Sequence, residues 1–468
     1  MAYSTINKST EHFTTKLVTG NSSSNDDNPS NQQTITGLSF QPDWLWGKNR
    51  VQGNPYYHVL VDAVRGSPQR MYSNSSLSES TDDGDVENFT SDGFKLGSGL
   101  NLNKNGESNV FWLWRAGGAS PSQTYVVKVV SDSGNKYRFD DFGTSAVTLD
   151  LQEGGTYTFD QSDSSNATHP LRFYTAADKS GGEYTTGVTT NGTPGSSGAY
   201  TRITVAASAP TLYYQCSSHA GMGGQVNTNS TFGSSNFSGS IQSTVSANTT
   251  AGFSMVSYTG TGSNPATIGH GLGVTPKMIV VKPRSVSYSW CVYHEQAGNN
   301  NLLYFDTNGA AGGSSVWNST SPTSSVFTVN DNQVNKSSET HIAYCFAEIN
   351  GYSKFGSYKG NGSSNGTFVY CGFRPEFIMV KRSDGGSENW FMLDNKRDDG
   401  MNPRNSYIMT NSTNAEDSNN STVDTDFLSN GFKLRATTGA LNGNGNTYIF
   451  MAFGQTMVGS NDIPTTAR

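Results

Sequence analysis

The sequence predicts an all-β protein made of several β-sandwich domains, three of which are copies of one module. Apolar runs of strand length alternate with turns rich in Gly, Ser, Thr and Asn, and helical periodicity is almost absent. The chain has 468 residues, which is too long for one hydrophobic core, and only 33% of them are hydrophobic and 14% charged. This balance is typical of many short strands joined by polar turns.

The three copies share five sequence landmarks in the same order. Each copy opens on an aromatic strand (FTTKLVTGN, FSMVSYTGT, FGSYKGN), continues with an apolar strand led by proline (QPDWLWGK, TPKMIVVK, RPEFIMVKR) and then has a second aromatic strand (YYHVLVDAVR, WCVYHEQ, WFMLDNKR). The motifs SDGFKL, SSVFTV and SNGFKL follow, and the copies close on NVFWLWRAG, THIAYCFAE and NTYIFMAFG. We therefore expect three antiparallel, jelly-roll-like sandwiches, with Trp44, Ile279 and Phe377 at equivalent positions.

The landmarks also divide the chain into domains. Copies two and three follow each other without a linker, so we expect them to form a rigid pair, and we expect the first copy to stand apart. The predicted units are residues 1–118 (first sandwich module with an N-terminal segment), 119–228 (an inserted domain), 229–251 (a linker), 252–350 (second module), 351–455 (third module) and 456–468 (a C-terminal tail).

The inserted domain contains the one motif that indicates metal chemistry. In YYQCSSHAGMGG, Cys216, His219 and Met222 are three residues apart after a strand, and His169 opens the earlier strand HPLRFY. A type 1 copper ion is bound by two imidazoles and one thiolate, with a weak axial thioether. His169, Cys216, His219 and Met222 are therefore the candidate ligands of a copper ion.

The same segment resembles the small blue copper proteins, the cupredoxins. YYQCSSHAGMGGQV is similar to the ligand loop of plastocyanin, its Cys-x2-His-x2-Met spacing is similar to that of amicyanin, and LDLQEGGTYTF resembles the strand before the first ligand. The resemblance implies a cupredoxin-like β-barrel in which the four candidate residues bind copper. Pro170 departs from the family, where Asn is common, and removes a backbone N–H beside the site. Two interpretations stay open: a copper site, and a loop that caps the barrel without a functional metal.

Composition argues against several classes of function. The net charge is −7 and no cluster of Lys and Arg occurs, so we expect no nucleic-acid partner. No run of about 18 apolar residues occurs and the start lacks the regions of a signal peptide, so we expect folding in a cytoplasm without membrane insertion. Cys291, Cys345 and Cys371 lie in or beside apolar strands and are expected to be small buried hydrophobes. Catalytic motifs are absent and no His, Asp or Glu recurs at one landmark in all three copies, so we expect no enzyme.

The repeated module resembles a domain of virion proteins from marine phages, especially cyanophages. MAYSTINKSTEHFTTKLVTGN, IAYCFAEINGYSKFGSYKGNGS and FVYCGFRPEFIMVKR carry this resemblance, and the HPLRFY and CSSHAGMGG segments are similar to domains of the same proteins. The resemblance implies a virion surface protein, expected as a homo-oligomeric tail fibre or adhesin that contacts other virion proteins and a host glycan or protein. Two alternatives are a capsid knob or decoration protein and a copper-binding redox protein. Tyr56, Tyr57 and Trp317 are the expected sugar-stacking residues.

Overall fold

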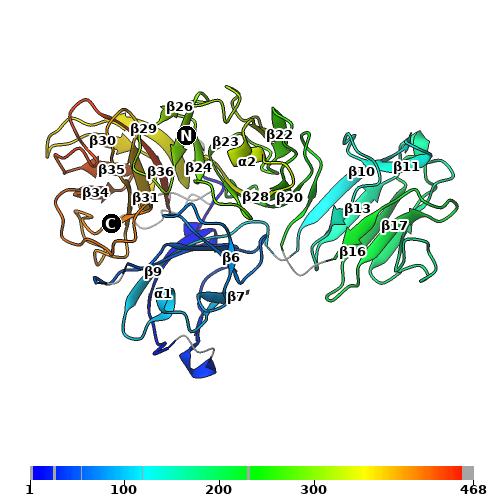
Figure 1. Cartoon of the computed structure of the whole chain (residues 1–468), viewed down its shortest axis with the longest axis horizontal. Helices are drawn as coiled ribbons and strands as arrows, with labels where there is room; N and C mark the ends of the chain where they lie inside the picture. Colours follow the sequence, from blue (N-terminus) through cyan, green and yellow to red (C-terminus); the bar gives the residue numbers. More distant parts are fainter. Residues whose placement is uncertain (1–3, 25–27, 54, 119, 229–231, 456–468) are drawn as a thin grey trace.

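The computed structural model describes residues 4–24, 28–53, 55–118, 120–228 and 232–455. Strands make up nearly all of the regular structure in these ranges, and the two α-helices found there, α1 (Leu100–Asn103) and α2 (Asn332–Asn335), are single turns. The all-β prediction is thereby confirmed. Three sandwiches gather into one body and a fourth domain, the insert, projects from it (Figure 1). The predicted tail at 456–468 lies outside the described residues.

Each of the three modules is a sandwich of one large and one small antiparallel sheet. The large sheet of module 1 has the order β1-β9-β3-β4-β5-β6, and its small sheet has the order β2-β8-β7. The bounds are β1 (Phe13–Thr19), β9 (Ser108–Trp114), β3 (Trp44–Asn49), β4 (Val59–Asp62), β5 (Gln69–Tyr72), β6 (Ser80–Thr81), β2 (Gln33–Ile35), β8 (Gly93–Leu96) and β7 (Val86–Thr90).

Modules 2 and 3 repeat this order. Their large sheets contain β21-β28-β23-β24-β25-β26 and β29-β36-β31-β32-β33, and their small sheets are β22-β27 and β30-β35-β34. The bounds in module 2 are β21 (Phe253–Thr259), β28 (Thr340–Ala347), β23 (Pro276–Pro283), β24 (Cys291–His294), β25 (Asn301–Tyr304), β26 (Gly312–Gly313), β22 (Ala266–Gly269) and β27 (Val326–Val329). Those in module 3 are β29 (Ser353–Lys359), β36 (Thr447–Gln455), β31 (Arg374–Arg382), β32 (Trp390–Asp394), β33 (Ile408–Met409), β30 (Phe368–Tyr370), β35 (Gly431–Leu434) and β34 (Thr425–Leu428).

Strand register shows which residues are equivalent. The matching cross-strand pairs are Trp44–Trp114, Met278–Phe346 and Phe377–Phe453. The expectation that Ile279 matches Trp44 and Phe377 was therefore wrong, and Met278 holds that position. Because side chains alternate along a strand, Ile279 points to the other face, into the core of module 2.

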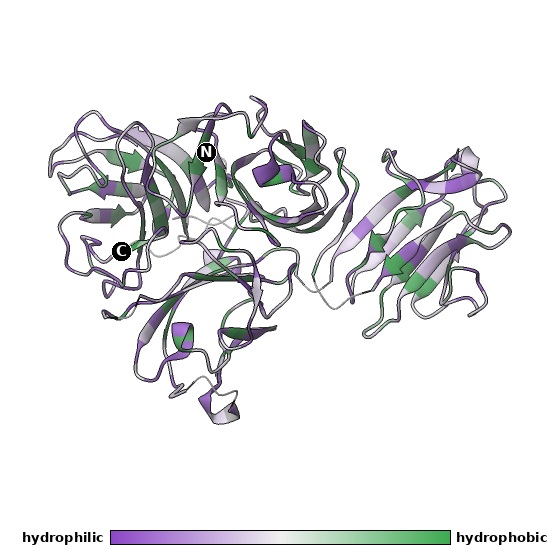
Figure 2. Cartoon of the chain, in the orientation of Figure 1, coloured by the Kyte–Doolittle hydropathy of each residue, from purple (hydrophilic) through white to green (hydrophobic). Residues whose placement is uncertain are grey.

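The large sheets of all three modules bury one face in a single shared core. Aromatic rings from different modules touch at every interface, with ring-centroid distances of 4.5 Å for Trp44–Tyr344, 5.2 Å for Phe13–Phe453 and 6.2 Å for Phe346–Phe453. The opposite face of each large sheet packs against its own small sheet. Module 1 therefore does not stand apart, which corrects the expectation from sequence. Figure 2 shows the hydrophobic residues on the strands and hydrophilic residues in the loops around them.

The contacts between modules follow each other in a cycle around the shared core. One backbone hydrogen bond of the same kind crosses each interface: Glu79 N to Arg284 O (2.7 Å), Ala311 N to Ser383 O (3.2 Å) and Glu416 N to Arg50 O (3.3 Å). The indole N–H groups of Trp290 and Trp390 donate to equivalent carbonyls of the neighbouring module, those of Tyr72 and Tyr304, at 2.8 Å. The three modules thus form a rigid body with approximate threefold symmetry, called here the three-module body.

The insert is a sandwich of two mixed sheets, ordered β11-β10-β13-β16-β15 and β12-β18-β17-β14. The bounds are β10 (Ser122–Ser131), β11 (Asn135–Phe139), β12 (Leu149–Asp150), β13 (Thr156–Asp160), β14 (Leu171–Tyr174), β15 (Val188–Asn191), β16 (Tyr200–Thr204), β17 (Leu212–Cys216) and β18 (Gln225–Asn227).

The segment expected to be a linker, 229–251, contains two strands in its described part. β20 (Ser243–Asn248) extends the large sheet of module 2 by pairing with β21, and β19 (Ser234–Asn236) pairs with β20. The hydroxyl of Tyr125 donates to Ser235 O at 2.8 Å, and Phe237 lies in the core of the insert. This segment therefore docks the insert onto module 2. Among the described residues, no helix has the length and apolarity needed to cross a membrane.

Candidate metal centre

His169, Cys216 and His219 meet at one end of the insert. His169 follows a short 3-10 turn, η3 (Ser164–Asn166), which is capped by a hydrogen bond from Ser165 N to the side chain of Asp163, and the N–H of His169 donates to Asn166 O at 2.8 Å. Cys216 ends β17, directly opposite the first residue of the antiparallel partner β14. Because two neighbouring strands hold the ligand-bearing segments, residues 47 positions apart in sequence are brought side by side.

The ligand atoms of these three residues form a triangle of metal-binding size. The Cys216 sulfur lies 3.9 Å from Nδ1 of His169 and 3.5 Å from Nδ1 of His219, and the three ligand atoms all lie within 4.8 Å of one another. With these two sides and a third side of up to 4.8 Å, the point equidistant from the three atoms lies up to about 2.4 Å from each, close to metal–nitrogen and metal–sulfur bonds of about 2.0–2.3 Å. Two imidazoles and a thiolate are the in-plane donor set of a type 1 copper site.

The site is closed on the side of the protein core and open at His219. Cys216 is fully buried, His169 is 9% exposed and His219 is exposed. Burial lowers the pKa of His169, and the neighbouring His219 lowers it further, which favours the neutral imidazole that a metal requires. The hydroxyl of Tyr137 donates to the carbonyl of His169 at 2.9 Å and fixes the backbone at this ligand.

The loop after Cys216 is held by several hydrogen bonds. The Lys179 ammonium donates to the carbonyls of Cys216 and Ser217 at 3.2 Å each, and Gly223 N donates to the side chain of Gln215 at 3.1 Å. Gly223 packs so closely that an added Cβ would lie 1.6 Å from the carbonyl oxygen of Tyr214. These hydrogen bonds and the close packing of Gly223 therefore fix the conformation of the loop through contacts within the protein.

Met222 and Pro170 occupy the two remaining predicted positions. Met222 is 1% exposed and belongs to the same apolar cluster as Cys216, and its carbonyl accepts a hydrogen bond from Tyr137 N at 2.9 Å. Its role as axial ligand stays a prediction. Pro170 has no N–H, but its carbonyl accepts a hydrogen bond from Ser217 N at 3.0 Å, which ties the two ligand-bearing segments together.

The expected sugar-stacking residues have different surroundings. Trp317 is 2% exposed and packs edge-on against Tyr293 in the core of module 2, so its expected role in sugar stacking was wrong. Tyr57 is 37% exposed and stacks on Tyr72, with ring centroids 4.5 Å apart, and Tyr56 is half-buried beside Lys104. The two tyrosines remain available at the surface of module 1.

Sequence reasoning missed the residues that support the metal centre. Tyr137 and Lys179 come from a separate strand and a separate loop, and neither stands in a recognisable motif. The other predicted burials hold, because Cys291, Cys345 and Cys371 are all buried and free of disulfides. Burial raises the pKa of each of these thiols, to about 12 for Cys371, so they are inert at neutral pH.

Comparisons with known proteins give one match. A family model described as Domain of unknown function (DUF7483) matches residues 8–137 and 227–456. These ranges contain the three-module body and leave out 138–226, which carries all four predicted metal ligands. No curated protein and no solved structure matches the chain.

Proposed function

The chain belongs to the family described as Domain of unknown function (DUF7483), and we propose that it is a non-enzymatic protein on the surface of a phage particle. In this proposal the chain is part of the tail, as a fibre or adhesin, and contacts the host envelope. The resemblance of the repeated module to virion proteins of marine phages motivates the proposal, and the arrangement of the modules supports it.

The observation that carries the proposal is the shared core of the three modules. Each large sheet is buried on both faces, by the shared core and by its own small sheet, so the small sheets and their loops face outward. A rigid body that presents three sets of similar loops suits multivalent contact, in which linked weak contacts gain avidity without any one tight site. It requires no catalytic centre.

Module 3 offers an exposed aromatic pair for such contact. Phe368 and Tyr370 lie two residues apart on the edge strand β30, so both point to the same face, and they are 44% and 63% exposed. Exposed aromatic rings bind sugars and proteins at a low cost in side-chain entropy. With Tyr57 on module 1, they give the three-module body two aromatic surfaces.

An adsorption assay tests this proposal. Antibody fragments raised against the three-module body are added to particles that carry this chain, and host-cell binding is counted. We expect blocked particles, or particles that lack the chain, to bind host cells poorly, whereas fragments against an unrelated virion protein leave adsorption unchanged. Unchanged adsorption together with a less stable shell would contradict attachment and favour the capsid knob or decoration protein.

The metal centre supports a second candidate function, a copper-binding domain. His169, Cys216 and His219 would hold the ion, and a copper–thiolate bond would supply the electron-transfer chemistry of a type 1 site. The insert docks onto module 2 through Asp150, which accepts a hydrogen bond from Thr244. Cys216 lies at the far end of β17 from this contact, so the site points away from the three-module body.

Copper titration of the purified chain tests the second candidate. We expect one Cu(II) per chain with intense visible absorption from the thiolate, which Cys216→Ser abolishes. Cys371→Ser, the matched change of a buried cysteine in module 3, should leave the absorption intact. Binding without the visible band, or a band that persists in Cys216→Ser, would contradict a type 1 site and leave the insert as a structural domain.

A further inference from the structure

A polar cavity of about 420 Å³ lies between module 1 and module 3. Module 3 supplies most of its wall through the loop 398–406 and the segment 416–419, and module 1 supplies Arg50. The size falls within the range of about 300–1,000 Å³ that is usual for small-molecule sites. The cavity lies outside the metal centre and belongs to the part of the chain that the family match covers.

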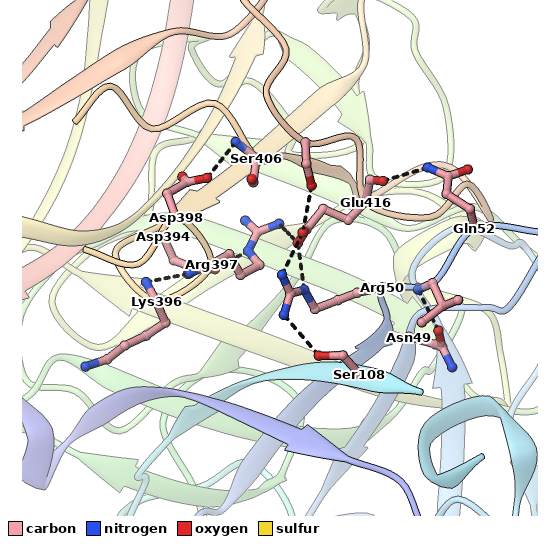
Figure 3. Close-up of polar contacts among 12 residues, drawn as sticks. Asn49, Arg50, Gln52, Ser108, Asp394, Lys396, Arg397, Asp398, Ser406 and Glu416 are labelled. Carbon is pink, nitrogen blue, oxygen red and sulfur yellow. Dashed lines mark hydrogen bonds and ion pairs between the residues drawn. The ribbon is translucent and has the colours of Figure 1, made fainter. Parts of the chain in front are cut away.

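A network of charged side chains borders the cavity through Arg50, Arg397 and Glu416, and Figure 3 shows its hydrogen bonds and ion pairs. The side chain of Arg397 is fully buried and donates to Asp394 at 2.6 Å and to Glu416 at 3.1 Å. Arg50 binds the same Glu416 carboxylate through two hydrogen bonds, of 2.9 and 2.7 Å, and donates to Ser108 at 3.0 Å. Because Glu416 binds both arginines and Asp394 also accepts a hydrogen bond from the indole N–H of Trp112, the network is held from several sides and is rigid.

The same network occurs a second time, between module 1 and module 2. There Arg65 pairs with Asp62 and Glu79, and Arg284 pairs with the same Glu79 at 2.8 Å. The two networks differ in the loop that follows the central arginine. In module 1 three residues, 66–68, connect Arg65 to β5, whereas in module 3 eight residues, 398–405, connect Arg397 to the equivalent Ser406.

The longer loop of module 3 forms the wall of the cavity. It supplies the lining residues Asp398, Asp399, Met401, Asn402 and Asn405. Loops on a rigid scaffold tolerate insertions and disproportionately carry binding residues, so a longer loop on a repeated framework is a candidate binding site.

One buried acceptor in this loop has no donor. Oδ1 of Asp398 accepts a hydrogen bond from Ser406 N at 3.1 Å, but no donor among the described residues reaches Oδ2, which is buried. Burial raises the pKa of Asp398, and hydrogen bonding and the charges of Arg397 and Arg404 oppose the shift. An unpaired buried carboxylate oxygen costs about 1–3 kcal/mol or more, so Asp398, which lines the cavity, gains a hydrogen bond when its carboxylate turns toward a ligand hydroxyl.

The charges of the lining select the class of ligand. Arg50 and Arg397 are offset by Asp398, Asp399 and Glu416, so the lining carries a small negative charge and disfavours anions. The remaining polar lining residues are amides and hydroxyls, which donate and accept hydrogen bonds, and Met401, 68% exposed, adds an apolar surface. The polar lining residues besides the five charged ones are Asn402, Asn405, Ser406, Ser418 and Asn419.

We propose that this cavity binds a neutral saccharide, whose hydroxyls pair with Asp398 and the neighbouring amides. The proposal deepens the proposed function and rests on it for its biological meaning, because it names the host-surface chemistry that module 3 recognises. The binding itself is a property of the full chain and is measured without particles.

Saturation-transfer NMR on the full chain tests the proposal, with glucose, galactose, mannose and N-acetylglucosamine as neutral probes and glucuronate as the anionic probe. We expect at least one neutral sugar to bind and glucuronate to bind more weakly. Asp398→Ala should weaken binding by roughly tenfold or more, since hydrogen bonds to charged groups contribute about 1.5–3 kcal/mol. The control Asp83→Ala removes an exposed carboxylate in module 1 and should bind as the parent does.

A loop exchange gives a second, independent variant. Replacing residues 398–405 by Gly-Ser-Pro, the sequence of 66–68 in module 1, should remove sugar binding while the tryptophan fluorescence of the body is kept. Absence of binding by every neutral sugar, or equal binding by Asp398→Ala, would overturn the proposal. If Asp398→Ala removes sugar binding but particles that carry it still adsorb normally, the cavity is a sugar site without a role in attachment.

Discussion

Trp44→Ala should destabilise all three modules, although the residue belongs to module 1. Trp44 is 2% exposed and its ring contacts Phe253, Tyr344 and Phe346 of module 2 as well as two tryptophans of its own module. Truncation of a buried tryptophan costs about 3–5 kcal/mol. The indole N–H has no hydrogen-bond partner among the residues that the structure describes, so its removal returns about 1 kcal/mol, and we expect a net loss of about 3 kcal/mol.

Native-state hydrogen exchange, read by mass spectrometry on peptides, measures this effect. A decrease of about 3 kcal/mol in the free energy of unfolding raises the fraction of molecules in the open, exchange-competent state about a hundredfold. We expect faster exchange in β28 and β36 as well as in β9, and unchanged exchange in the insert, whose core is separate. All seven tryptophans lie in the modules, so their fluorescence reports global unfolding of the three-module body alone.

Two control variants complete the experiment. Trp44→Phe keeps an aromatic ring and removes the unpaired N–H, so it should cost about 1 kcal/mol. Val226→Ala lies in the core of the insert and should raise exchange only there. If Trp44→Ala speeds exchange only in peptides of module 1, the modules are independent and the reasoning from the shared core is refuted.

Three further predictions concern other parts of the chain. Gly223→Ala should destabilise the insert by about 1–3 kcal/mol and weaken copper binding, because the new Cβ meets Tyr214 O; an unchanged melting temperature of the insert would contradict the close packing. Glu79→Ala should cost about 3–5 kcal/mol in urea unfolding, because it leaves the buried Arg65 with one carboxylate fewer; a cost under 1 kcal/mol would show that Asp62 suffices. Burial lowers the pKa of Lys48 from 10.5 to about 8, so the folded chain loses this proton at a lower pH than the unfolded chain does. The charged lysine therefore destabilises the fold below pH 8, and this destabilisation disappears as the pH rises toward 10.5. The gain in unfolding free energy from Lys48→Met should therefore shrink between pH 7 and pH 10, and a constant gain would contradict a buried charge at this lysine.

The strands and the candidate metal ligands could be predicted from sequence because both depend on local patterns. Repeated landmarks located the modules, and the spacing of Cys216, His219 and Met222 after a strand indicated the metal centre. The distance from His169 to Cys216 depends on β14 and β17 being neighbours, which the resemblance to cupredoxins implied and spacing alone did not.

The assembly of the three modules was missed, although the sequence contains a sign of it. Strands such as β3 and β28 are continuously buried and mostly apolar instead of alternating, as is expected of sheets that are covered on both faces. Trp317 was misjudged because a tryptophan near a turn looks the same in sequence whether it faces solvent or the core. The strands β19 and β20 were taken for a linker because their residues are small and polar, and their pairing depends on β21.

Cryo-EM of intact particles that carry this chain tests the central claim most directly. The account predicts a compact three-lobed density with one projecting lobe, the insert, on the outside of the particle and attached to the tail. The same density on the capsid shell would contradict the tail location and indicate a capsid decoration protein. Particles without this density would contradict the proposal that the chain is a virion surface protein.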